Sequence, residues 1–204
     1  MSTTTLVPET QLREDLDVLP GPLYRMPLEK YEELVAAGVF GKRDRFHLIA
    51  GLLVNKMTKH PPHSAACEAV RAAIEARLPS GFHVRGEQPL RIPSQSSIPE
   101  PDLVLARGTW RDYAARHPEP IDVALVVEVA DSSLALDRKL GQIYSAAGIP
   151  VYGILNLVDR QLEIYTDPSP TGYETVRIFK AGDSAPLELD GREVGRILVV
   201  DVLP

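Results

Sequence analysis

The chain has 204 residues, of which 44% are hydrophobic and 25% charged, as in an ordinary water-soluble globular protein. Collagen-like, low-complexity and disordered classes are excluded, and at this length one domain can bury a core without disulfides or a structural metal. The single cysteine, Cys67, fits a reducing cytoplasm. The net charge is −6, so the overall field repels nucleic acid and any such partner must bind at a local site.

The N-terminal residues lack the basic start and apolar core of a signal peptide, and no run reaches the ~18 apolar residues of a membrane helix. We therefore expect a cytoplasmic protein without membrane contact. Residues 1–22 hold Thr, Pro and acidic residues without a sustained period, which predicts a flexible N-terminal arm. No internal repeat or linker follows, so residues 23–204 are expected to form a single domain.

The first part of this domain contains two predicted helices and a strand region. Behind Pro27, apolar residues at three- and four-residue steps predict a helix that ends at Gly38. Residues 46–55 (FHLIAGLLVN) predict two short strands or one bent strand. Residues 60–63 (HPPH) are expected to form a rigid break between elements of secondary structure, after which Ser64 caps a helix. The apolar stripe of that helix comprises Cys67, Val70, Ile74 and Leu78.

The remaining chain is rich in strands and contains one helix. Apolar or alternating segments predict strands at 84–92, 102–106, 123–129, 151–158, 161–166, 173–179, around Leu187 and at 196–202. Ser132 or Ser133 is expected to cap a helix that ends at Gly148, and Asp190-Gly191 is a plausible tight turn. This order predicts an α/β fold with a central mixed β-sheet flanked by helices.

Three charged residues in this pattern are candidates for a catalytic or metal-binding site. Glu128 lies inside the apolar run VALVVEV, where an isolated buried carboxylate is costly and needs a partner or a metal. Asp102 opens a short strand after Pro101 and could lie on a neighbouring strand. Lys139 lies at the border of the apolar face of the next helix, from which its ammonium could reach back to the sheet. The alternatives are a turn aspartate, a strand-end glutamate facing water and a surface lysine.

These three residues belong to a longer pattern, which comprises Pro101-Asp102, Glu128-Val129, Ser132-Ser133, Asp137, Lys139, Tyr144, Gly148 and the strand VYGILNLV. The pattern resembles the Uma2 family of endonucleases, which belongs to the PD-(D/E)XK, or restriction-endonuclease-like, superfamily. The resemblance runs from about Met26 to Tyr165 and includes the FHLIAGLLV stretch and His63. It implies a restriction-endonuclease-like fold and a metal-dependent nuclease.

The resemblance also implies roles for the residues that match. Asp102 and Glu128 match the acids of the PD and (D/E)XK motifs, and Lys139 matches a lysine that has moved to the following helix, since Ala130 occupies its usual place. Two carboxylates can hold Mg²⁺ or Mn²⁺, which polarises a phosphodiester for attack by water while the lysine offsets the developing charge. The carboxylates are expected to converge on one ion and, without it, to repel each other.

This chain departs from the family pattern near its N-terminus. Members typically carry YELIDGEL where this chain has FHLIAGLL, so His47, Ala50 and Leu52 replace three acids. We predict that His47 joins Asp102 and Glu128 as a metal ligand and favours Mn²⁺, because nitrogen donors suit transition metals better than magnesium. The alternative is a packed or surface histidine in a strand. His60 and His63 could also bind a metal, but no cysteine pair completes a zinc site.

The function predicted from these residues is a metal-dependent endonuclease that hydrolyses phosphodiester bonds of nucleic acid, with DNA favoured and a homodimer as the assembly. One alternative is a catalytically inactive relative that serves as a nucleic-acid or protein interaction module, favoured by the missing acids and the negative net charge. Another is a hydrolase of small phosphate esters. A fold by itself does not decide between them.

Overall fold

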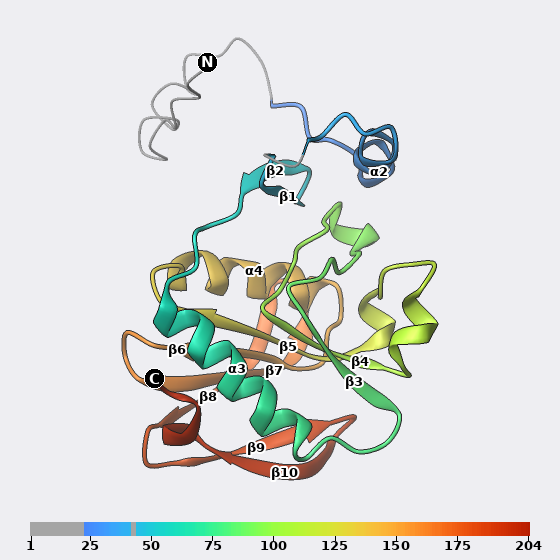
Figure 1. Ribbon diagram of the computed structural model, residues 1–204. Helices are drawn as coiled ribbons and strands as arrows, with labels where there is room; N and C mark the ends of the chain where they lie inside the picture. Colours follow the sequence, from blue (N-terminus) through green and yellow to red (C-terminus); the bar gives the residue numbers. More distant parts are fainter. Residues whose placement is uncertain (1–22, 42–43) are drawn as a thin grey trace.

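The computed structural model describes residues 23–41 and 44–204, so the predicted arm at residues 1–22 lies outside the described part of the chain. A six-stranded sheet with the order β3-β4-β5-β6-β7-β8 forms the centre (Figure 1). Its strands are β3 (Phe82–Gly86), β4 (Leu103–Arg107), β5 (Val123–Ala130), β6 (Tyr152–Asn156), β7 (Gln161–Ser169) and β8 (Gly172–Lys180). β5 and β6 are parallel and the other neighbours antiparallel, which confirms the predicted mixed sheet.

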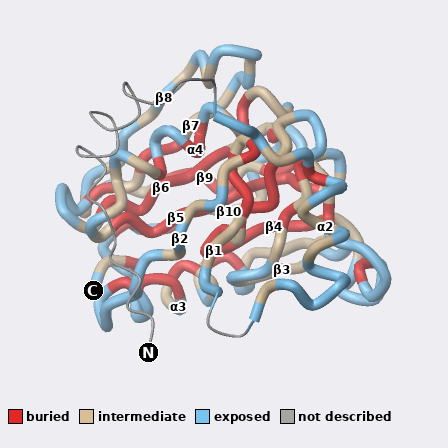
Figure 2. Tube along the Cα trace, turned by 90° about the horizontal axis from the view of Figure 1, so that it is seen from above, coloured by how far each residue is buried: buried red, intermediate tan, exposed pale blue. Residues whose placement is uncertain are grey.

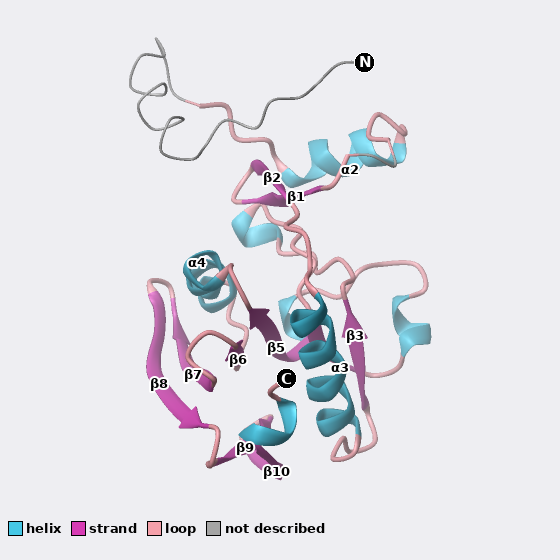
Figure 3. Ribbon diagram, turned by 60° about the vertical axis from the view of Figure 1, so that its left-hand side comes forward, coloured by secondary structure: helices cyan, strands magenta, loops and turns pink. Residues whose placement is uncertain are grey.

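Helices α3 (Pro61–Glu75) and α4 (Leu134–Ala146) cover opposite faces of this sheet (Figure 3). Side chains of a strand alternate between the two faces, so β5 contributes Val127 and Val129 to the core under α3 but Val126 to the core under α4. All eight residues of β5 are buried, and Figure 2 shows the buried residues concentrated on the central strands. Glu128, at an even-numbered position, therefore faces α4.

Two hairpins complete the single domain. β1 (Phe46–Ile49) and β2 (Leu52–Asn55) pair antiparallel around Ala50 and Gly51, both at positive φ, so the 46–55 segment forms two strands rather than a bent one. This hairpin packs against α2 (Leu28–Ala36) away from the sheet. β9 (Ser184–Leu189) and β10 (Arg192–Leu198) pack on the α3 side, joined by the turn predicted at Asp190-Gly191. Among the described residues, no helix is long and apolar enough to span a membrane.

The start of α3 differs from the prediction in a way that matters for the site. Pro61 and Pro62 occupy the first turn of the helix, with His60 before it, so the expected break at 60–63 is wrong and Ser64 is not the cap. Proline is tolerated there because the first amides of a helix have no partner within it. As a result His63 lies on the helix, one turn before Cys67, and both side chains are buried.

Candidate functional site

A polar cleft with a volume of about 460 Å³ lies between the β1–β2 hairpin, the start of α3 and the start of α4. Asp102 and Glu128, the two acids singled out in the sequence, both line it. The lining also includes His47, Lys59, His63 and Asp137. The cleft thus gathers carboxylates and basic side chains from segments that are far apart in the sequence.

Reciprocal hydrogen bonds hold the two acids in place. β4 pairs with β5 in a register that sets Leu103 opposite Val127, so Asp102, one residue before β4, comes beside Glu128. The backbone N–H of Asp102 donates to Oε2 of Glu128 at 2.9 Å, and the N–H of Val129 donates to Oδ2 of Asp102 at 2.8 Å. Each carboxylate is therefore fixed by the strand that carries the other.

Glu128 is an acid without a cationic partner in the described part of the chain. The side chain is buried, and its Oε1 lies 3.0 Å from the hydroxyl of Tyr144, on α4. Burial raises the pKa of Glu128 well above its usual value, and the charges of Asp102 and Asp137 raise it further. Burial and the neighbouring acids therefore favour the protonated form of Glu128 over the charged form.

Asp102 has the opposite electrostatic environment. Its Oδ1 accepts a hydrogen bond from Nζ of Lys59 at 2.6 Å, and its Oδ2 lies 3.1 Å from Nε2 of His63. Burial alone would raise the pKa of Asp102, but the hydrogen bonds from His63 and Lys59 outweigh it and the pKa is lowered. The two acids therefore differ in their surroundings: Asp102 pairs with Lys59 and His63, whereas Glu128 has no cationic partner among the described residues.

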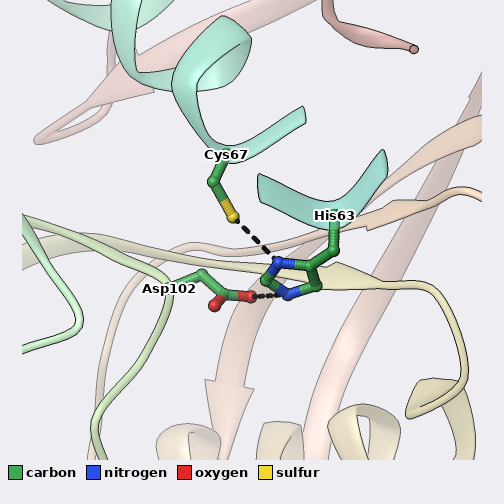
Figure 4. A group of neighbouring side chains, drawn as sticks. All are labelled: His63, Cys67 and Asp102. Atoms are coloured by element: carbon green, nitrogen blue, oxygen red, sulfur yellow. Dashed lines mark hydrogen bonds and ion pairs between the residues drawn. The ribbon is translucent and has the colours of Figure 1, made fainter. Parts of the chain in front are cut away.

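His63 continues this network to Cys67. Its Nδ1 lies 3.5 Å from the Cys67 thiol, and Figure 4 shows the imidazole ring between the thiol and the Asp102 carboxylate. Donor atoms of the three residues lie within 4.8 Å of one another, close enough to hold one metal ion. However, His63 turns a different ring nitrogen to each neighbour, so the arrangement shown is a hydrogen-bonded chain. Burial raises the pKa of Cys67 to about 12, which keeps the thiol protonated.

Asp137 is a third buried acid of the cleft. It lies in the first turn of α4, and the Ser133 hydroxyl donates a hydrogen bond to its Oδ2 at 2.5 Å. Ser133 precedes the helix as predicted, but its side chain bonds this acid and not a helix amide. Burial raises the pKa of Asp137 to about 6. The sequence pattern contained Asp137 without a role, although its place in the helix that follows the acidic strand was a usable signal.

The structure separates the other two residues singled out in the sequence. His47, on β1, lines the cleft, and its buried Nδ1 has no hydrogen-bond partner among residues 23–41 and 44–204; burial lowers its pKa. Lys139 is exposed and does not line the cleft. The buried face of α4 comprises Asp137, Leu140, Gly141, Tyr144 and Ser145, so at 100° per residue Lys139 lies on the opposite side of the helix.

Comparison with known proteins identifies a family and a fold. The family model that matches is Uma2, described as "Putative restriction endonuclease", over residues 28–196. A solved structure described as "a putative nuclease belonging to DUF820 from Anabaena variabilis ATCC 29413" superimposes with a TM-score of 0.64 at 12% identity. The match covers 87% of this chain and 97% of that one. The comparison with curated proteins gives no match.

The structural match confirms the restriction-endonuclease-like fold of the mixed sheet with helices on both faces. At this level of identity it shows the fold alone. The family model covers most of the chain, including both strands that carry the acids of the cleft. Family and fold together indicate a nuclease of the restriction-endonuclease type. On this evidence the chain belongs to the Uma2 family.

Proposed function

We propose that this protein is a metal-dependent endonuclease that hydrolyses phosphodiester bonds of DNA with Mg²⁺ or Mn²⁺. The observation that carries the proposal is the pair of acids, Asp102 and Glu128, clamped side by side through reciprocal backbone bonds in a polar cleft. Asp137 adds a third carboxylate to the same cleft. Oxygen donors of this kind suit small divalent cations.

The carboxylate oxygens of the cleft are suitable ligands for a divalent cation, and the raised pKa of Glu128 agrees with the lack of a positive charge beside it among the described residues. A carboxyl group buried among other acids gives up its proton readily only when a positive charge arrives to compensate it. Asp102 and Glu128 would hold the ion. His47, whose Nδ1 has no partner in the part of the chain that the structure describes, would add a nitrogen ligand that favours Mn²⁺. When bound, the ion supplies polarisation of the phosphodiester and a more acidic water.

The chain's own residues prepare this chemistry. The hydroxyl of Tyr144 and the backbone N–H of Asp102 fix the two oxygens of Glu128, and the N–H of Val129 fixes Asp102. Side chains locked in this way need little reorganisation when an ion and a phosphate arrive. Because Glu128 must lose its proton to become a ligand, metal binding is expected to release protons and to strengthen as the pH rises.

A second candidate is a nucleic-acid-binding protein that does not cleave. Two observations favour it: acids of the family pattern are replaced by His47, Ala50 and Leu52, and the ammonium of Lys59 already occupies one oxygen of Asp102. The replaced acids and the ion pair with Lys59 each reduce the negative charge that the cleft offers to a metal ion. This candidate keeps the fold and the binding cleft but predicts no turnover.

Cleavage assays with the full-length protein separate these candidates. Supercoiled plasmid DNA, single-stranded DNA, RNA and a small phosphodiester, bis(4-nitrophenyl) phosphate, would each be incubated with Mg²⁺, Mn²⁺ or EDTA. We expect metal-dependent nicking of plasmid DNA that Asp102→Asn abolishes. Glu174→Gln, an exposed acid on β8, is the matched control and should cleave normally.

Three other outcomes would contradict parts of the proposal. Binding of DNA without any cleavage would support the second candidate, and turnover confined to the small diester would indicate a phosphate-ester hydrolase. Equal activity in the wild type and in Asp102→Asn would point to a contaminating nuclease. Sedimentation of the protein with and without DNA tests the homodimer, which is part of the same proposal.

A further inference from the structure

Lys59 is the lysine that the fold brings to the acids of the cleft. It lies in the segment between β2 and α3, and its side chain is one third exposed. Its Nζ lies 2.6 Å from Oδ1 of Asp102 and 3.1 Å from Oε1 of Glu87. The ammonium therefore sits at the mouth of the site, touching the acid that is central to the proposed function.

The other lysine that lines the cleft among the described residues is engaged elsewhere. Lys56 pairs with Glu100 at 2.6 Å. Lys139, the lysine that the family pattern implied, is exposed on the outer side of α4. A lysine close to a phosphate bound at Asp102 would thus come from the segment before α3 and not from α4.

We propose that Lys59 is the catalytic lysine of this protein and contacts the phosphate that is cleaved. The inference rests on the proposed function, since it assigns a residue to that reaction. The oxygen of the attacking water forms a bond to phosphorus, and the bond from phosphorus to the leaving oxygen breaks. The water gives one proton to solvent and the leaving oxygen takes one from it. Lys59 keeps its protons and offsets the negative charge that builds on the phosphate oxygens.

The surroundings of Lys59 support this electrostatic role over that of a base. Its ammonium donates to Asp102 at 2.6 Å and lies 3.1 Å from Glu87, so two carboxylates hold it as a cation. An ammonium group has three N–H donors and no lone pair with which to accept a proton from water. It can, however, stabilise an anion close to Asp102 without any reorganisation of its own charge.

The same contact has a second consequence, for metal binding. Lys59 occupies an oxygen of Asp102 that a divalent ion would use, and two cations at one carboxylate repel each other. Removing the ammonium should therefore strengthen metal binding while it slows cleavage. A lysine with only a structural role would not give these opposite changes, because loosening the site would weaken both.

The test compares four variants of the full-length protein: Lys59→Ala, Lys59→Arg, Lys56→Ala and Lys139→Ala. Lys139→Ala is the control for activity, since Lys139 is exposed and does not line the cleft, and Lys56→Ala gives the effect of losing an ion pair of the same length from the cleft. Mn²⁺ affinity is measured by calorimetry, cleavage on plasmid DNA, and folding by the melting temperature of the metal-free protein. For Lys59→Ala we expect cleavage to fall about 100-fold or more, as for the loss of one donor to a developing anion.

In that variant the Mn²⁺ affinity should rise several-fold. Lys59→Arg should recover part of the cleavage, Lys139→Ala should keep it, and Lys56→Ala should lose less of it than Lys59→Ala. Cleavage by Lys59→Ala at the wild-type rate, or a weaker affinity for Mn²⁺, would overturn the assignment while the proposed function stands. Loss of cleavage in Lys139→Ala with normal cleavage in Lys59→Ala would return the role to α4. A wild-type protein that cleaves no nucleic acid would overturn the proposed function and the role of Lys59 with it.

Discussion

Replacing each acid of the cleft by its amide should change stability in opposite directions, although both acids line the same site. Asp102 is ionised in the folded protein and accepts hydrogen bonds from Lys59, His63 and the backbone of Val129. Asp102→Asn removes that charge. Hydrogen bonds to charged groups contribute about 1.5–3 kcal/mol each, so we expect a loss of about 2 kcal/mol. In a protein of this length that lowers Tm by about 4–8 °C.

Glu128→Gln should instead make the folded protein more stable. The folded state raises the pKa of Glu128 above its ordinary value of 4.5, so folding takes up a proton in the pH range between 4.5 and the folded pKa. Stability from this group is fully present below pH 4.5 and falls by about 1.4 kcal/mol per pH unit as the pH rises towards the folded pKa. Glutamine does not titrate, and its amide can still accept from the N–H of Asp102 and donate to Tyr144.

Urea denaturation of the metal-free wild type and both variants, from about pH 5 to about pH 7, measures these effects. The advantage of Glu128→Gln over the wild type should grow with pH, while Asp102→Asn should be less stable at each pH. A constant difference between Glu128→Gln and the wild type would show that Glu128 is ionised in the folded protein. Higher stability of Asp102→Asn would show that Lys59 and His63 do not stabilise the carboxylate.

Further predictions concern groups around the cleft. Asp137→Asn should be more stable than the wild type above about pH 6 and should lose that advantage towards pH 3.8, because burial raises the pKa of Asp137 to about 6; thermal melts over this range measure it. Gly141→Ala places a Cβ 2.9 Å from Cε1 of Tyr152 and should cost about 1–3 kcal/mol in urea denaturation, whereas Gly182→Ala, with open space around it, should change little. The Cys67 thiol, whose pKa is about 12, should react with iodoacetamide only after unfolding, as mass spectrometry of native and denatured protein would show.

The sequence predicted the sheet and the two central acids because both leave local signals. A single charge inside VALVVEV is conspicuous, since an apolar run of that length is buried on both faces. Asp102 follows a proline at the start of a short apolar run. Antiparallel pairing of the two strands then brings Asp102 beside Glu128. These inferences needed only the neighbours of each residue in the chain.

The partners of Asp102 left no such signal. Lys59 is separated from it by 43 residues, and the contact depends on where α3 begins. The sequence interpretation placed residues 60–63 in a loop, so the contact between Lys59 and Asp102 was not predicted. Prolines in the first turn of a helix cannot be distinguished by sequence from prolines in a loop. Lys139 was favoured because Leu136, Leu140 and Ile143 were taken as the buried face of α4. The buried face lies instead around Gly141 and Tyr144, where Gly141 packs closely against Tyr152.

Under the proposed function, metal binding in the cleft depends on how its two central acids are paired and protonated, and not only on the number of acids. Lys59 pairs with the Asp102 carboxylate, and burial raises the pKa of Glu128, which favours the form of Glu128 that carries a proton. A divalent ion that enters must displace that proton and share Asp102 with an ammonium group, so its affinity depends on pH and on Lys59 more than on the number of carboxylates. His47 fits this arrangement, since a neutral imidazole adds a ligand without adding another anion to be compensated. The two central acids that this chain keeps are Asp102, which pairs with Lys59, and Glu128, whose pKa is raised by burial.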